Sequence, residues 1–157
     1  MLMTGVSALS GFFWTEPEEE EPVNDEQAVE EIIQKRYVAL NAIFKGKVEP
    51  MKAIWSHSDD VTYMGPGGKI RVGWKEVLAD WKAQAALKLG GKVIPSDLNI
   101  NVGTDMAIVV NNERGVNVDQ TGKVRSIAIR ATHVLRKIKN EWKIVSEHAD
   151  LLPFLNQ

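Results

Sequence analysis

Residues 129–148, IRATHVLRKIKNEWKIVSEH, contain two segments of alternating apolar and polar side chains joined by a tight turn at residues 138–141. A period of two on both sides of a turn is typical of two adjacent antiparallel strands. Two such strands form one wall of a curved sheet. Polar side chains set among apolar ones on a concave wall are what a small-molecule pocket requires. The stretch therefore predicts a binding pocket.

Composition indicates one folded domain. The chain has 157 residues, of which 44% are hydrophobic and 25% charged, as in ordinary globular proteins. The formal net charge of −2 argues against nucleic-acid binding, because no overall positive field is available for phosphates. Cysteine is absent, which excludes disulfides, thiolate nucleophiles and cysteine-based metal sites. We expect a cytoplasmic location, with export as the alternative if residues 1–14 are a signal remnant.

The amino-terminal segment differs from the rest of the chain. Residues 1–14 are mostly apolar but shorter than the roughly 20 residues that a membrane span needs. They also lack the basic start and the clean cleavage site of a secretory signal. An acidic run with two prolines follows at residues 16–22 and predicts a solvated linker. We therefore predict a tail at residues 1–22, a folded domain at 23–157 and no membrane span.

Three helices are predicted from caps and apolar stripes. Asn24 and Gln27 resemble a capping box that starts the first helix, and Gly46 closes it. Pro50 lies near the first turn of a short second helix. The third helix is predicted over residues 74–89, where a pair of glycines ends it.

Six strands complete the pattern. A glycine-rich turn at residues 65–68 separates strands at 60–64 and 69–72. Four longer strands follow in succession, at residues 92–102, 106–118, 124–138 and 142–150. The order of elements predicts an α+β fold with the helices on one face of a bent sheet.

Several stretches resemble a known superfamily. They are residues 36–41 (RYVALN), residues 55–65 (WSHSDDVTYMG), the Gly73–Trp74 helix start, and the strand pair from Arg130 to His148. They resemble the nuclear-transport-factor-2-like superfamily, and within it the SnoaL-like group related to ketosteroid isomerase and to the association domain of calmodulin-dependent kinase. The resemblance covers roughly residues 24–153. It implies a cone-shaped fold in which three N-terminal helices pack on a curved antiparallel or mixed sheet. It implies no single activity, because the superfamily includes isomerases, cyclases, dehydratases, hydrolases and binding modules.

Ketosteroid-isomerase chemistry itself is disfavoured. The resemblance implies a carboxylate base at an Asp-Pro step after the first strand, where this chain has Gly65 and Pro66. The protonated aspartate of those enzymes would fall near Thr132 or Val134. Tyr37 is a plausible counterpart of their helical tyrosine. Proton abstraction needs a positioned base, and none is present at that step.

Polar candidates lie on the last two strands. We predict that Arg130 and Thr132 face the concavity, where Arg130 could bind a carboxylate through both ends of its guanidinium. The alternative for Arg130 is a surface residue or a dimer-interface ion pair. His148 shares a face with Trp142 and Asp150 and is predicted to point inward as an acid–base group, or to be a buried histidine held by Asp150. His133, on the opposite face from Arg130, is predicted to be an interface or outer-face residue.

Aromatic residues are predicted to line the pocket and to suit a flat apolar ligand with one anionic end. They are Tyr37, Trp55, Tyr63, Trp74 and Trp81. His57 with Asp59 or Asp60 matches no known metal-ligand spacing, so neither a metal nor a cofactor is predicted.

These expectations leave two classes of function. The first is a homodimeric protein that binds a small organic acid or a hydrophobic metabolite. The alternative is an enzyme of the SnoaL-like kind, such as a cyclase, isomerase or hydrolase, that uses His148, Asp150 and Arg130. A homodimer through the outer sheet face is predicted because two long strands carry apolar residues on both faces. Those residues include Val109, Val116, Ile127 and Ile129.

Overall fold

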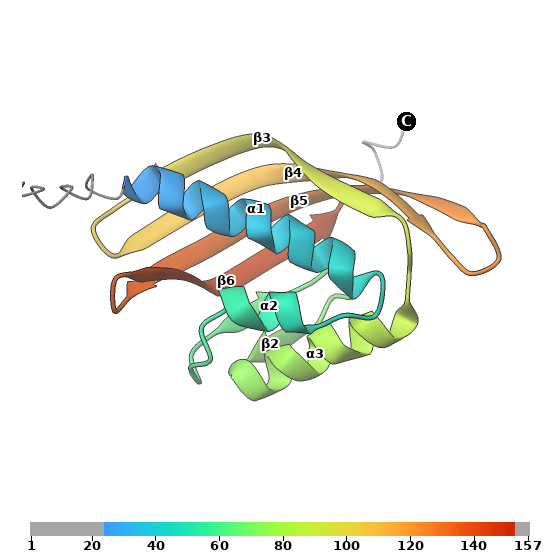
Figure 1. Cartoon of the computed structure of the whole chain (residues 1–157), viewed down its shortest axis with the longest axis horizontal. Helices are drawn as coiled ribbons and strands as arrows, with labels where there is room; N and C mark the ends of the chain where they lie inside the picture. The colour runs from blue at the N-terminus through green and yellow to red at the C-terminus, as the bar shows by residue number, and fades with distance from the viewer. Residues whose placement is uncertain (1–23, 153–157) are drawn as a thin grey trace, which may run out of the picture.

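A computed structural model describes residues 24–152 and shows an α+β fold in which helices cover one face of a curved mixed sheet (Figure 1). The elements follow in the order α1 Asp25–Ile43, α2 Glu49–Ile54, β1 Thr62–Met64, β2 Ile70–Val72, α3 Trp74–Leu87, β3 Lys92–Val102, β4 Met106–Val118, β5 Val124–Ile138 and β6 Glu141–Leu151. Helix α3 follows the β1–β2 hairpin, so the helices do not all precede the first strand. The predicted tail at residues 1–22 lies outside the described part of the chain.

The six strands form one sheet in the order β2-β1-β6-β5-β4-β3. Strands β3 to β6 are a meander of antiparallel neighbours, and β1 joins it by pairing with β6 in parallel. Figure 1 shows α1 lying across the long strands, with α2 and α3 below α1 in this view. The parallel pairing brings β1 beside the end of the chain and makes the sheet mixed.

Local sequence explains where α1 begins. Asn24 is the N-cap, and its side-chain oxygen accepts a hydrogen bond of 3.0 Å from the backbone N–H of Glu26. Asp25 and Glu26 lie in the first turn, where the helix dipole favours negative charge. The predicted capping box is only half formed, because the side chain of Gln27 donates to Glu31 instead.

The glycine pair after α3 allows the chain to enter β3 close to β4. Gly90 and Gly91 have φ of +66° and +78°, in the left-handed region that favours glycine. A Cβ on Gly91 would overlap the carbonyl oxygen of Val116. Any larger residue would therefore push the start of β3 away from its partner strand.

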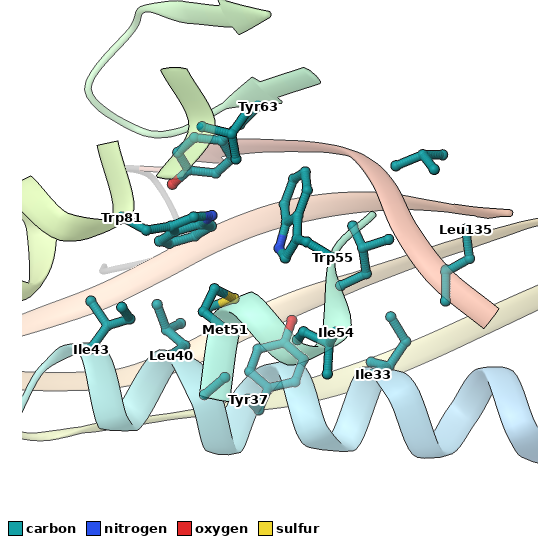
Figure 2. Close-up of a cluster of buried hydrophobic side chains, with 14 of the residues drawn as sticks. Ile33, Tyr37, Leu40, Ile43, Met51, Ile54, Trp55, Tyr63, Trp81 and Leu135 are labelled. Carbon is teal, nitrogen blue, oxygen red and sulfur yellow. The ribbon is translucent and has the colours of Figure 1, made fainter. Parts of the chain in front are cut away.

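The hydrophobic core is richest in aromatic rings at the end of the sheet that carries β1. Trp55, Trp81 and Tyr63 pack together, with the ring centroids of Tyr63 and Trp81 4.5 Å apart. Figure 2 shows Trp55 beside these rings, above the face of α1 that carries Tyr37 and Leu40. The core therefore ties α1, α2 and α3 to the sheet at this end.

A β-bulge in β6 decides which side chains face the helices. His133 pairs with Glu147 and Val134 with Ser146, but the next residue, Leu135, pairs with Ile144. Val145 is thus an extra residue in β6, and it reverses the alternation of the strand at this point. Trp142 and Ile144 are buried before the bulge, whereas Glu147 and Ala149 are buried after it. His148 consequently points to the outer face of the sheet.

The apolar residues of β4 and β5 divide between the two faces of the sheet. Val109 is buried under the helices, and Ile127 and Ile129 line a cavity on the concave side. The exposed apolar side chains of β4 are those of the alternate positions Met106, Ile108 and Val110. Within residues 24–152, no helix is long and apolar enough to span a membrane.

Candidate functional site

A cavity of about 480 Å³ lies between the helices, the β1–β2 hairpin and the concave face of the sheet. Its walls are mostly aliphatic and aromatic and come from α1, α3 and strands β3 to β6. The apolar lining includes Leu40, Phe44, Leu87, Val93, Ile129 and Ala149. Five charged side chains also line it: Arg36 and Glu113, which meet each other, and Lys69, Arg71 and Asp80 on the side of the β1–β2 hairpin and α3.

Arg36 is the centre of a buried ion cluster. It lies on the buried face of α1 and is 2% exposed. Its Nε donates to Oε2 of Glu147 at 3.1 Å, and its Nη2 donates to the other oxygen of that carboxylate. Its Nη1 lies 2.9 Å from Oε1 of Glu113, close enough for an ion pair but not aligned for a hydrogen bond. One cation therefore serves two carboxylates.

The cluster sets the protonation of its members. Burial opposes the charge of Arg36, but Glu113 and Glu147 outweigh it and raise the pKa of the guanidinium further above its usual value. Burial would raise the pKa of Glu147, but Arg36 and His133 outweigh burial and lower that pKa to about 2. Arg36 and Glu147 are therefore both charged at neutral pH.

Tyr37 and Asn111 extend the cluster along the sheet. The hydroxyl of Tyr37 donates to Oε1 of Glu113 at 3.0 Å, and the amide of Asn111 donates to that hydroxyl at 2.6 Å. Burial raises the pKa of Tyr37, so its hydroxyl keeps its proton. Oε1 of Glu113 thus has two partners, whereas Oε2 accepts no hydrogen bond from any residue in the described range.

His133 completes the cluster behind Glu147. Its ring is fully buried, and Nδ1 lies 3.3 Å from Oε2 of Glu147. The ring also meets Tyr37 edge-on, with centroids 6.3 Å apart. The prediction that His133 lies on the outer face is wrong, because the concave side of β5 carries the odd-numbered residues.

A second polar wall faces the cavity from the β1–β2 hairpin and α3. Gln84 donates to the hydroxyl of Tyr63 at 3.1 Å and to Asp80 at 2.7 Å, and Arg71 donates to Asp80 at 2.9 Å. Gly65 lies against the hydroxyl of Tyr63, where a Cβ would overlap it. This wall is built from hydrogen-bonded pairs and closes the side of the cavity.

Comparison with known proteins places the chain in a family. The family model for the SnoaL-like domain matches residues 29–152. The chain belongs to the SnoaL-like family. Searching the curated proteins produced no match to this SnoaL-like protein.

Solved structures share the fold of this SnoaL-like domain. A proposed dehydratase of the nuclear-transport-factor-2-like family from Streptomyces avermitilis is 23% identical, with a TM-score of 0.71 over 82% of this chain and 96% of that one. A nuclear-transport-factor-2-like superfamily protein from Salmonella enterica is 19% identical, with a TM-score of 0.68 over 80% and 89% of the two chains. A protein of unknown function from Pseudomonas putida is 17% identical, with a TM-score of 0.69 over 80% and 85%. At these identities the likeness shows the fold alone.

Four predicted site residues of the SnoaL-like domain gather on the outer face. Thr132 pairs with His148 and Arg130 with Asp150 across β5 and β6, and Nε2 of His148 lies 3.2 Å from Oδ1 of Asp150. Arg130, His148 and Asp150 are exposed there. The prediction that they face the concavity is wrong. His148 has the parity of the buried Trp142, but the extra residue Val145 turns it outward.

The predicted aromatic residues have three different environments. Tyr63 lines the cavity, whereas Tyr37 reaches it through Glu113. Trp55 and Trp81 are packed into the core rather than along the cavity wall. Trp74 is half-buried and stacks on His57, with ring centroids 4.2 Å apart.

The charged residues of the cavity were missed by sequence reasoning. Arg36 follows Ile33 at helical spacing, and Glu113 lies on the strand face that carries Ala107 and Val109, so both charges fall on an apolar face. A charge at a core position of that kind is the signal that could have found them. Glu147 has no such signal, because the bulge hides its parity. In residues 24–152 no group of three acidic or histidine side chains is placed to hold a metal ion.

Proposed function

We propose that this SnoaL-like domain binds a small, mostly apolar molecule in the cavity between the helices and the concave face of the sheet. The observation that carries the proposal is the cavity of about 480 Å³ with mostly apolar walls and a few charged groups, among them the pair Arg36 and Glu113. Binding pockets of roughly 300–1,000 Å³ with apolar walls and a few polar groups are typical of small-molecule sites.

The geometry supports binding more than it supports the enzymatic alternative. That alternative assigned acid–base roles to His148 and Asp150 and anion holding to Arg130. All three lie on the far side of the sheet from the cavity. A general acid or base must come within hydrogen-bond reach of its substrate, and these groups have no access to a molecule in the cavity.

Filling the cavity is expected to abolish binding of Prodan, a neutral naphthalene dye whose emission shifts to the blue in apolar surroundings. Ala149 lines the cavity on β6, so Ala149→Phe places a ring inside it. Fluorescence titration should give saturable binding to the unaltered protein and a loss of at least tenfold in affinity for Ala149→Phe.

The matched control is His148→Phe, which adds a similar ring one residue away on the opposite face of β6. It should leave dye binding unchanged. Equal loss in both variants, or no saturable binding to the unaltered protein, would contradict the proposal. Circular dichroism checks that both variants fold, and Ile129→Phe provides a second cavity-filling variant should Ala149→Phe fail to fold.

We also propose that two copies of the chain associate through the outer sheet face. An outer patch, which consists of Met106, Ile108, Val110 and Val134, supports this proposal. Ile108 and Val134 are paired across β4 and β5, and Ile108 is 49% exposed. Apolar side chains gathered on an uncovered sheet face favour a partner, and a symmetric second copy is the commonest one.

Light scattering coupled to gel filtration tests this association. The unaltered protein should show twice the chain mass of 17.5 kDa at micromolar concentration. Ile108→Glu should give the single-chain mass, because association would bury a carboxylate at the patch centre with no cation to compensate its charge. Ile70→Glu is the control, since Ile70 is 67% exposed on β2, at the opposite edge of the sheet. A single-chain mass for the unaltered protein would refute the dimer.

A further inference from the structure

We infer that the polar end of the ligand is a hydrogen-bond donor, a hydroxyl or an ammonium, that binds Oε2 of Glu113. This inference rests on the proposed function, namely that the cavity holds a small apolar molecule. It differs from the sequence-based expectation of an anionic ligand, and the reason lies in the contacts that Arg36 already makes within the buried cluster.

Arg36 is not available as an anion receptor. One edge of its guanidinium donates two hydrogen bonds to Glu147. On the other edge Nη1 lies 2.9 Å from Glu113, without a hydrogen bond, and is itself buried. Arg36 is thus shared between two carboxylates, Glu113 and Glu147, and each of the three side chains is no more than 2% exposed. A ligand carboxylate would therefore approach a site whose cation is already matched.

Glu113 presents the free acceptor. Its Oε1 is occupied by Tyr37 and Arg36, while its Oε2 has no donor among residues 24–152. Oε2 belongs to a side chain that lines the cavity. A buried carboxylate oxygen is costly to leave without a donor, and hydrogen bonds to charged acceptors are stronger than neutral ones.

The surroundings of Glu113 offer an acid no compensating cation. On the opposite wall Arg71 is held by Asp80 at 2.9 Å. Lys69 lines the cavity too, but it is exposed, and exposed charges are screened by water. A carboxylate placed at Oε2 would be repelled by Glu113, whereas an ammonium there would be attracted by it.

A series of naphthalenes with one substituent at the same ring position separates these ligand classes. The probes are naphthalene, naphthol, naphthylmethylammonium and naphthoate, and the measurement is isothermal titration calorimetry at neutral pH. We expect the naphthol and the ammonium to bind about tenfold or more tighter than naphthalene, which corresponds to one hydrogen bond to a charged group. Naphthoate should bind more weakly than naphthalene.

Glu113→Gln sharpens the test because glutamine has nearly the same shape and removes one negative charge. Arg36 then keeps one carboxylate partner, so affinity for naphthoate should rise and affinity for the ammonium should fall by about tenfold or more. Lys69→Gln is the matched control, which removes a charge from the exposed part of the cavity wall. It should leave the order of affinities unchanged.

The outcomes distinguish the two proposals. Equal binding of all four probes would overturn the donor preference and leave the binding function standing. If none of the four probes binds, both the binding function and the donor preference are refuted. Tightest binding of naphthoate, lost in Lys69→Gln, would overturn the inference in favour of an anion site at Lys69. Should Glu113→Gln fail to fold, the order of affinities in the unaltered protein decides by itself.

Discussion

Arg36→Met is expected to destabilise the fold by about 3–5 kcal/mol, the usual cost of removing one partner from a buried ion pair. Methionine fills much of the same volume on α1, so the loss is mainly electrostatic. Glu113 and Glu147 would remain at 2% and 0% exposure without their shared cation. Guanidinium chloride denaturation followed by circular dichroism gives the change in the free energy of unfolding.

The control for this prediction is another arginine ion pair that lies at the surface. Arg136 meets Asp60 at 2.9 Å, with side chains that are 38% and 58% exposed. Arg136→Met should cost less than about 1 kcal/mol, because exposed pairs are screened by water. Adding Glu113→Gln and Glu147→Gln to Arg36→Met should recover part of the loss by removing the stranded charges. A cost below about 1 kcal/mol for Arg36→Met would show that the cluster does not hold α1 to the sheet.

Acid is expected to remove about 3 kcal/mol of stability through Glu147 alone. Its pKa is lowered from 4.5 to about 2 in the folded protein, chiefly by Arg36 against the opposing effect of burial. A carboxylate with a lowered folded pKa stabilises the fold fully above its unfolded pKa. That contribution is lost as the pH falls from about 4.5 toward 2.

The measurement is the free energy of unfolding at a series of pH values in this window, for the unaltered protein and for Glu147→Gln. The variant is less stable at neutral pH, but it should lose about 3 kcal/mol less on acidification. Other carboxylates with lowered pKa values, such as those of Asp25 and Asp60, titrate in both proteins and cancel in the comparison. Glu141→Gln, at a carboxylate that is 71% exposed, should follow the unaltered protein. Parallel curves for Glu147→Gln and the unaltered protein would contradict the assignment.

The secondary structure could be predicted from the sequence because its signals are local. The bounds of β3, β4 and β5 agree with the prediction to the residue, since glycine-rich turns and a regular period of two delimit each strand. Asn24 as a cap and Pro50 in the first turn of α2 were likewise readable from neighbouring residues. The SnoaL-like family followed from the same local stretches and is confirmed.

The orientation of the site residues could not be read in this way. A period of two separates the faces of a strand without stating which face the helices cover, and Arg130 and His133 were assigned to the wrong faces for that reason. In β6 a single additional residue, Val145, exchanges the two faces within the strand, so that Glu147 rather than His148 points inward. No feature of the strand's composition marks that position.

The sequence by itself therefore determined the helices, the strands, their order and the family, because caps, turns and periodicity act between residues close in the chain. Tertiary structure alone decided the chemistry of the cavity. Arg36 on α1, Glu113 on β4 and Glu147 on β6 become one cluster only when the sheet curls under the helix. The charged groups that a ligand meets in the cavity depend on this cluster, and the cluster forms only through three-dimensional contact between distant segments.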